Sequence, residues 1–319
     1  MFCGQVGVAS EEELEYAAAL RGAAVREVTF VGGEPLLDPR LEDAIAEARS
    51  LGFEAIGVQT NGRGLDLERL AALGVTDVHL SVHAATAAAH DYHTQVEGSF
   101  AAIEEALRER AGVTVVVTSV VTRSSFRELA ALPRWLVDRG VAAWTIAMPH
   151  VAGRAATSFD RVLPRLGLAM PYVLHAASRA MAFGLPTAIA GAPLCVLGPH
   201  ATLAMRDDVP RAYAEVCDAC SARSRCVGVD AAYLARFTAE ELRAIEAPRD
   251  DVAMPAALAR MFVGAGTLVS TPVTPHDAPA DVRRHLPLLG RPRAATAEVR
   301  GRTESRDARE LFPDLFDDD

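Results

Sequence analysis

Lysine is absent from this chain of 319 residues, and all 32 of its basic residues are arginine. Acidic residues outnumber the arginines and give a net charge of −10, which argues against nonspecific binding of nucleic acid through a basic surface. No uninterrupted apolar run approaches the roughly 20 residues that a membrane-spanning helix needs. The chain also opens without a basic and apolar leader, so we expect a cytoplasmic protein.

Cysteine is scarce but unevenly distributed. Four of the five cysteines fall between Cys195 and Cys226, a stretch of 32 residues. In a protein of a reducing compartment, such a group is more typical of metal or redox chemistry than of disulfides. The length is sufficient for one large α/β domain with a smaller appendage.

Strands alternate with helices through the first half of the chain. β-branched and apolar runs predict strands, and segments of helical spacing, such as the one that carries Phe100, Ile103 and Leu107, separate them. This alternation is the pattern of parallel βαβ units and predicts an open or partial (β/α) barrel with its ligand face at the carboxyl ends of the strands. The expected strands are 25–31, 55–59, 77–82, 113–121 and 142–148.

The four residues that follow Val31 form the most informative motif of the chain. Gly32, Gly33, Glu34 and Pro35 end the first of these strands. Two adjacent glycines allow a sharp turn and close approach of a ligand, although the same four residues also suit an ordinary strand-to-helix turn. The element resembles the GGEP motif of radical S-adenosylmethionine (SAM) enzymes, where the motif holds the amino group of SAM.

Other strand ends resemble the same superfamily. Thr60 and Asn61 match its third-strand element beside SAM, Ser81 its fourth strand, and Met148 its last strand near the adenine. The resemblance covers roughly residues 2–240. It implies SAM binding by these positions and leaves three candidates for substrate contact, which are His83, His90 and Arg154.

Purely structural roles remain open for several of these residues. Asn61 before Gly62 also suits a turn, and His90 with Asp91 could cap the segment that follows. His83, His90 and His93 could suggest a metal site, but the chain lacks a helical H-E-x-x-H motif.

Cys3 lies where the resemblance places the third ligand of a catalytic [4Fe–4S] cluster, because Phe2 precedes it as an aromatic residue does in the family's C-x3-C-x2-C loop. The other two ligands would lie at positions −5 and −1. The chain as given thus departs from the family by lacking the first barrel strand and two cluster cysteines. We expect an upstream extension of the reading frame; the alternative is a remnant that has lost them.

The later cysteines have the spacing of a second metal site. Cys195, Cys217, Cys220 and Cys226 include one C-x2-C pair and can bind either zinc or a cubane cluster. Their context resembles the twitch or SPASM-like extension of radical SAM enzymes, which implies an auxiliary [4Fe–4S] cluster, with zinc as the alternative.

The resemblance implies reductive cleavage of SAM to a 5′-deoxyadenosyl radical that modifies an unknown substrate, with a peptide preferred. It also implies an electron donor such as flavodoxin or ferredoxin. Two other classes stay open. One is a non-catalytic iron–sulfur or zinc protein, and the other is an ordinary barrel enzyme with Glu34 as a general base, for which the sequence offers no clear partner.

Three regions are expected. Residues 1–160 would form the partial barrel, 161–245 a helix and the auxiliary-cluster extension, and 246–319 a poorly ordered tail rich in proline and arginine. Within the extension, the spacing of Thr238 and Glu241 predicts a capping box at the start of a helix.

Overall fold

Seven parallel strands form one sheet whose spatial order follows the chain from β1 to β7. The computed structural model describes residues 20, 27–151, 153–205 and 211–246, but not the side chain of Arg154. Because each strand pairs with the next one along the chain, the sheet has the connectivity of a barrel that is not closed. The strands are β1 (Glu27–Phe30), β2 (Ala55–Thr60), β3 (Asp77–Ser81), β4 (Thr114–Val120), β5 (Ala143–Ala147), β6 (Thr187–Ala190) and β7 (Ala204–Met205).

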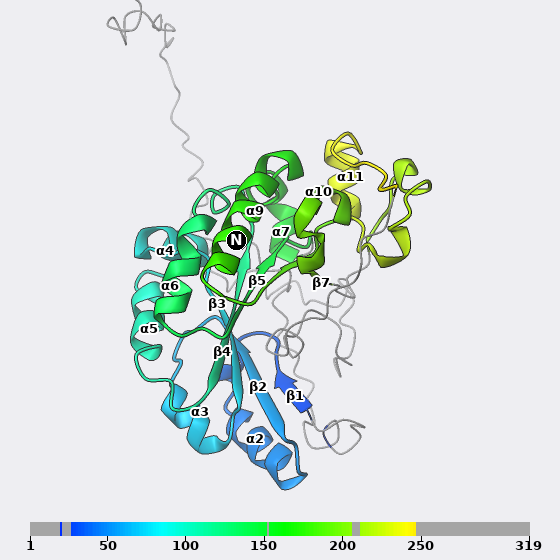
Figure 1. Ribbon diagram of the computed structural model, residues 1–319. Helices are drawn as coiled ribbons and strands as arrows, with labels where there is room; N and C mark the ends of the chain where they lie inside the picture. The colour runs from blue at the N-terminus through cyan, green and yellow to red at the C-terminus, as the bar shows by residue number, and fades with distance from the viewer. Residues whose placement is uncertain (1–19, 21–26, 152, 206–210, 247–319) are drawn as a thin grey trace, which may run out of the picture. The chain divides into compact units, whose positions relative to one another are not determined.

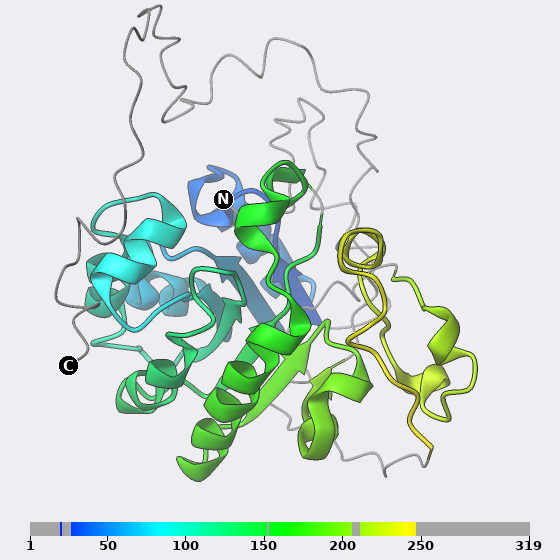
Figure 2. The ribbon, with the colours of Figure 1, turned by 90° about the horizontal axis from the view of Figure 1, so that it is seen from above.

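Helices connect the strands and cover one face of the sheet, as Figures 1 and 2 show for α4, α5, α6 and α9. Side chains cap several of them; Asp66, for example, accepts a hydrogen bond from the backbone N–H of Arg69 at the start of α3. The helices are α2 (Leu41–Ser50), α3 (Leu67–Leu73), α4 (Ala87–Thr94), α5 (Ser99–Ala106), α6 (Leu132–Asp138), α7 (Gly153–Thr157), α8 (Phe159–Val162), α9 (Leu166–Ala182), α10 (Leu194–Leu197) and α11 (Ala231–Phe237). Short 3-10 turns are η1 (Pro35–Leu37), η2 (Leu129–Ala131), η3 (Gly198–Leu203), η4 (Glu215–Cys217) and η5 (Arg223–Arg225).

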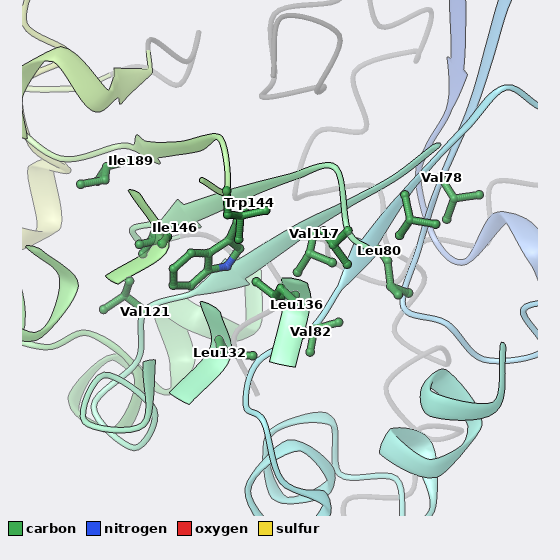
Figure 3. Close-up of a cluster of buried hydrophobic side chains, with 14 of the residues drawn as sticks. Val78, Leu80, Val82, Val117, Val121, Leu132, Leu136, Trp144, Ile146 and Ile189 are labelled. Atoms are coloured by element: carbon green, nitrogen blue, oxygen red, sulfur yellow. The ribbon is translucent and has the colours of Figure 1, made fainter. Parts of the chain in front are cut away.

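The main core lies between the sheet and these helices. Trp144 of β5 is fully buried in it, and Figure 3 shows its indole among Val117, Leu136 and Ile146. The indole N–H donates a hydrogen bond to the Ser119 hydroxyl at 2.9 Å, so the one polar atom of this large side chain has a partner.

The opposite face of the sheet is lined differently. Ser81, Thr118, Thr145 and Ala188 are neighbours in register across four strands, and residues in one such row point to the same side. A smaller apolar cluster on this face centres on Val116 and four small or flexible neighbours. On this face, the row of Ser81 carries short side chains, whereas the neighbouring row of Gln59, His79 and Val116 carries longer ones.

The partial (β/α) barrel predicted from the sequence is confirmed, and each of the five expected strands is present within a few residues. β6 and β7 continue the same sheet and were not expected. The predicted loss of a first strand, the ligand Cys3 and the tail after residue 246 fall outside the described residues and stay predictions. In the described part of the chain, no helix is both long and apolar enough to cross a membrane.

Candidate active site

The end of β1 is shaped by two glycines in the left-handed region of backbone conformation. Gly32 has φ +98° and Gly33 has φ +34°, and a Cβ added at either would meet no atom of the described residues within 4 Å. Glycine is therefore favoured at these two positions by the left-handed backbone conformation, and not because a side chain would collide with a neighbouring atom. The backbone here stays open to an approaching ligand.

The Glu34 carboxylate connects the ends of β1 and β2. One oxygen, Oε1, accepts hydrogen bonds from the Thr60 hydroxyl at 2.5 Å and the Leu36 backbone N–H at 3.3 Å. The other oxygen, Oε2, accepts from the Asn61 backbone N–H at 2.8 Å. A carboxylate offers about four acceptor positions, so Oε2 retains capacity for a further donor such as an ammonium group.

The structure thus brings together three of the predicted SAM residues, Glu34, Thr60 and Asn61, around one carboxylate. Ser81 ends β3, in register with Thr118 of β4, and is half-buried. Met148 directly follows β5 and is buried in the main core. No hydrogen bond links Ser81 or Met148 to Glu34 among the described contacts, so their roles at SAM remain predictions.

Three histidines cluster beyond the end of β3. The rings of His83 and His90 stack with centroids 5.7 Å apart, and the ring of His93 lies 6.3 Å from that of His83. The His90 Nδ1 accepts a hydrogen bond from the His83 backbone N–H at 3.2 Å. The His90 Nε2 is buried without a hydrogen-bond partner.

Burial keeps these imidazoles neutral. It is the main cause that lowers the pKa of His90 to about 4, which Asp91 opposes and His93 reinforces. Burial also lowers the pKa of His83 well below its ordinary value, with further contributions from His90 and His93, and it lowers the pKa of His93. Neutral imidazoles of this kind can line a binding site through apolar contacts and hydrogen bonds, but they do not supply positive charge.

Asp91 has a structural function. Its carboxylate accepts hydrogen bonds from the backbone N–H groups of Gly98 and Phe100 and from the Ser99 hydroxyl, at 2.7 to 2.9 Å. These bonds outweigh the opposing effect of burial and lower the pKa of the carboxyl group. The expected capping of the segment that follows is therefore confirmed for Asp91 at α5, whereas His90 contacts the His83 backbone instead.

The four later cysteines, although they come from separate turns, line one small cavity of about 20 Å³. Cys195 lies in α10, Cys217 ends η4, Cys220 follows it, and Cys226 follows η5. All four are half-buried free thiols. Among the residues that the structure describes, no three His, Cys, Asp or Glu side chains are arranged to hold a single metal ion.

Backbone N–H groups point at the sulfur atoms that line this cavity. The N–H groups of Leu194 and Gly228 lie 3.3 and 3.4 Å from the Cys226 Sγ, and that of Ile245 lies 3.3 Å from the Cys220 Sγ. Donors of this kind stabilise thiolates, which are the form in which cysteine binds metals. Burial, by contrast, raises the pKa of Cys195.

One cluster of polar contacts was not predicted from the sequence. His150, after β5, pairs with Asp230 at 3.0 Å, and Tyr233 and Glu241 contact the start of α9. The expected capping box at Thr238 and Glu241 is wrong, because Thr238 ends α11 and the Glu241 carboxylate contacts Tyr233 and Gly167 instead. The side chain of Arg154, a substrate candidate, lies outside the described residues.

Comparison with known proteins shows similarity of part of this chain to one superfamily. Residues 5–132 match the model of the Radical SAM superfamily. The match, together with the relatives below, supports a radical SAM domain in this part of the chain, and proteins of that superfamily use a [4Fe–4S] cluster and SAM.

Curated relatives match parts of the chain. It is 28% identical over 144 residues to an AdoMet-dependent heme synthase of Nitratidesulfovibrio vulgaris, which covers 43% of this chain and 38% of the relative. It is 31% identical over 166 residues to a PqqA peptide cyclase of Streptomyces rochei, and this match covers 50% of this chain and 45% of the relative. The chain thus spans less than half the length of these curated relatives.

Among solved structures, Streptococcus suis SuiB bound to the precursor peptide SuiA matches with a TM-score of 0.44 and 15% identity. That match covers 54% of this chain and 40% of the other.

Proposed function

We propose that this protein is a radical SAM enzyme that modifies a peptide. The single observation that carries the proposal is the Glu34 carboxylate, held by Thr60 and Asn61 beside an open glycine pair, within the segment that matches the superfamily. This arrangement offers an anionic acceptor and unobstructed backbone at the carboxyl end of a parallel sheet, where barrel enzymes bind their ligands.

The residues fit the methionine end of SAM. The Glu34 carboxylate would accept from the ammonium group, and the half-buried Ser81 at the end of β3 lies two strands away for a further polar contact. Thr60 would hold the carboxylate in orientation through its 2.5 Å hydrogen bond. Cys3 would be one ligand of the catalytic [4Fe–4S] cluster.

Held by Glu34 and Cys3, SAM and the cluster would supply the chemistry of the superfamily, the one-electron reductive cleavage of SAM to methionine and 5′-deoxyadenosine with removal of a hydrogen atom from a substrate carbon. The protein's own contribution is to orient SAM and to exclude water. The row of Ser81, Thr118 and Thr145 places three hydroxyl groups on the inner face of the sheet.

The cysteine cavity supports an auxiliary cluster. The four cysteines line one cavity, and three backbone N–H groups face two of the sulfur atoms. Such donors stabilise the thiolates that either an iron–sulfur cluster or zinc requires. We propose an iron–sulfur cluster ligated by Cys195, Cys217, Cys220 and Cys226, with zinc as the alternative.

A peptide is proposed as substrate because a PqqA peptide cyclase is among the relatives and matches half of this chain. The other relatives carry different names, so the substrate assignment rests on this similarity alone. A ferredoxin or flavodoxin would supply the electron.

The test is anaerobic reconstitution of the chain with the codons that precede it in frame, followed by measurement of iron and of 5′-deoxyadenosine. The proposal predicts reductant-dependent 5′-deoxyadenosine. Iron bound without SAM cleavage would instead support the non-catalytic alternative.

A further inference from the structure

A clamp formed by residues 228–245 packs against the segment that follows β5. At its first contact, the Asp230 Oδ2 lies 3.0 Å from the His150 Nδ1 and accepts a hydrogen bond from the Val151 backbone N–H, also at 3.0 Å. The Oδ1 accepts from the Ala232 backbone N–H at the start of α11. One carboxylate therefore joins the clamp to the end of β5.

The Asp230 carboxylate is ionised at neutral pH. Burial opposes ionisation, but the hydrogen bonds from His150, Val151 and Ala232 outweigh it and lower the pKa to about 2. An ionised carboxylate only accepts hydrogen bonds, so the His150 Nδ1 carries the proton of this pair. The contact is thus charge-assisted and directional.

The second contact lies at the start of α9. The Tyr233 hydroxyl donates to the Glu241 carboxylate and accepts from the Leu166 backbone N–H at 2.9 Å. The Glu241 Oε1 accepts from the Gly167 backbone N–H at 3.1 Å and from the Arg165 guanidinium at 3.3 Å. Figures 1 and 2 show α11, in yellow, beside the green segments that follow β5.

Both ends of the clamp meet the cysteine cavity. Upstream, the Gly228 N–H faces the Cys226 Sγ. Downstream, the Ile245 N–H faces the Cys220 Sγ, and the Ile245 carbonyl accepts from the Ser221 N–H at 2.9 Å. A centre that joins the four thiolates would therefore fix the clamp at both ends and reduce its freedom to open.

We propose that Asp230 and Glu241 are positioning residues that couple occupation of the cysteine site to the order of the segment after β5. This inference rests on the proposed auxiliary cluster. Asp230 acts on His150 and Val151, at the carboxyl end of β5, and Glu241 acts on the start of α9. An occupied cysteine site thereby holds in place the half-exposed His150 imidazole at the ligand edge of the sheet.

The test is hydrogen exchange at single-residue resolution on the full chain, metal-free and after anaerobic reconstitution with iron and sulfide. The readouts are the amides of Val151, Leu166 and Gly167, each of which donates to the clamp. Reconstitution should slow their exchange about tenfold, because closed clamp contacts protect them.

Two variants test the two contacts of the clamp separately, and each serves as the control for the other. Asp230→Ala should abolish the cluster-dependent protection of Val151 and leave that of Gly167, and Glu241→Ala should do the reverse. Both should keep the iron content and the visible absorption of the cluster, because neither residue contacts a sulfur atom in the described contacts. Asp230→Asn and Glu241→Gln provide a milder pair if the alanine variants fold poorly, and they should reduce the same amides' protection in part.

Equal exchange with and without the cluster would overturn the coupling, as would loss of protection at all three amides in both variants. If the chain took up no iron at these cysteines, the auxiliary cluster and the coupling would fall together. Cluster-dependent protection without SAM cleavage would overturn the proposed enzymatic function and support the coupling.

Discussion

At the scale of single residues, the site depends on one carboxylate with three internal donors. Glu34→Gln removes the charge but keeps the size of the side chain. We expect SAM affinity to fall about 10- to 100-fold, since a hydrogen bond to a charged group contributes about 1.5 to 3 kcal/mol. The measurement is equilibrium binding of SAM to the reconstituted protein.

Glu54→Gln is the matched control, because Glu54 is exposed and lies before β2, away from the end of β1. Its affinity for SAM should equal that of the wild type. An unchanged affinity in Glu34→Gln would remove Glu34 from the SAM site.

The buried histidines predict a dependence of stability on pH. The pKa of His90 is about 4 in the folded chain and about 6.5 when unfolded, so between these values the unfolded state binds more protons. Stability is therefore greatest above pH 6.5 and falls as the pH drops towards 4. A shift of this size corresponds to on the order of 3 kcal/mol for His90 alone.

His90→Gln keeps an acceptor for the His83 N–H and removes the titrating ring. Denaturant unfolding at pH 7 and pH 4.5 should show a smaller difference between the two pH values for this variant than for the wild type. The same loss of stability in both proteins would contradict the assignment. His83 and His93 retain part of the effect, since the pKa of each is also lowered.

At the scale of elements, β5 holds the sheet to its helical layer through Trp144. The Trp144→Ala substitution leaves a large void and removes the donor to Ser119, so we expect a loss of about 3 to 5 kcal/mol in the free energy of unfolding. Leu168→Ala, on the exposed face of α9, should change it by less than about 0.5 kcal/mol. Comparable losses in the two variants would contradict this placement of the core.

The elements that sequence predicts well are those with a strong local signal. The run of valines around Val115 to Val117 predicts β4, and the glycines before Glu34 mark the end of β1. β6, with the residues Thr187, Ala188, Ile189 and Ala190, is only four residues long and half alanine, so its local signal is short and it becomes a strand by pairing with β5. Glu241 has the spacing of a capping residue, but its carboxylate forms hydrogen bonds with Tyr233 and Gly167 instead.

The same distinction applies to the site. Thr60, Asn61 and Glu34 follow strand ends that periodicity locates, so their meeting at one edge of the sheet is predictable. His150 and Asp230 are 80 positions apart and neither lies in a recognisable motif. Only the packing of α11 onto the segment after β5 brings them together.

At the scale of the whole molecule, the two proposed cofactor regions are parts of one structure. The sheet edge at Glu34 belongs to the segment that matches the Radical SAM superfamily, residues 5–132. The cysteine cavity combines Cys195, after β6, with three cysteines that follow β7. The clamp of residues 228–245 connects that cavity to the end of β5.

The measurement that tests the account most directly is the formation of 5′-deoxyadenosine from SAM by the extended, iron-loaded protein. The account predicts 5′-deoxyadenosine and methionine in equal amounts, dependent on a low-potential reductant, and strongly reduced in Glu34→Gln. A fully iron-loaded protein that binds SAM but yields no 5′-deoxyadenosine under reducing conditions would contradict it.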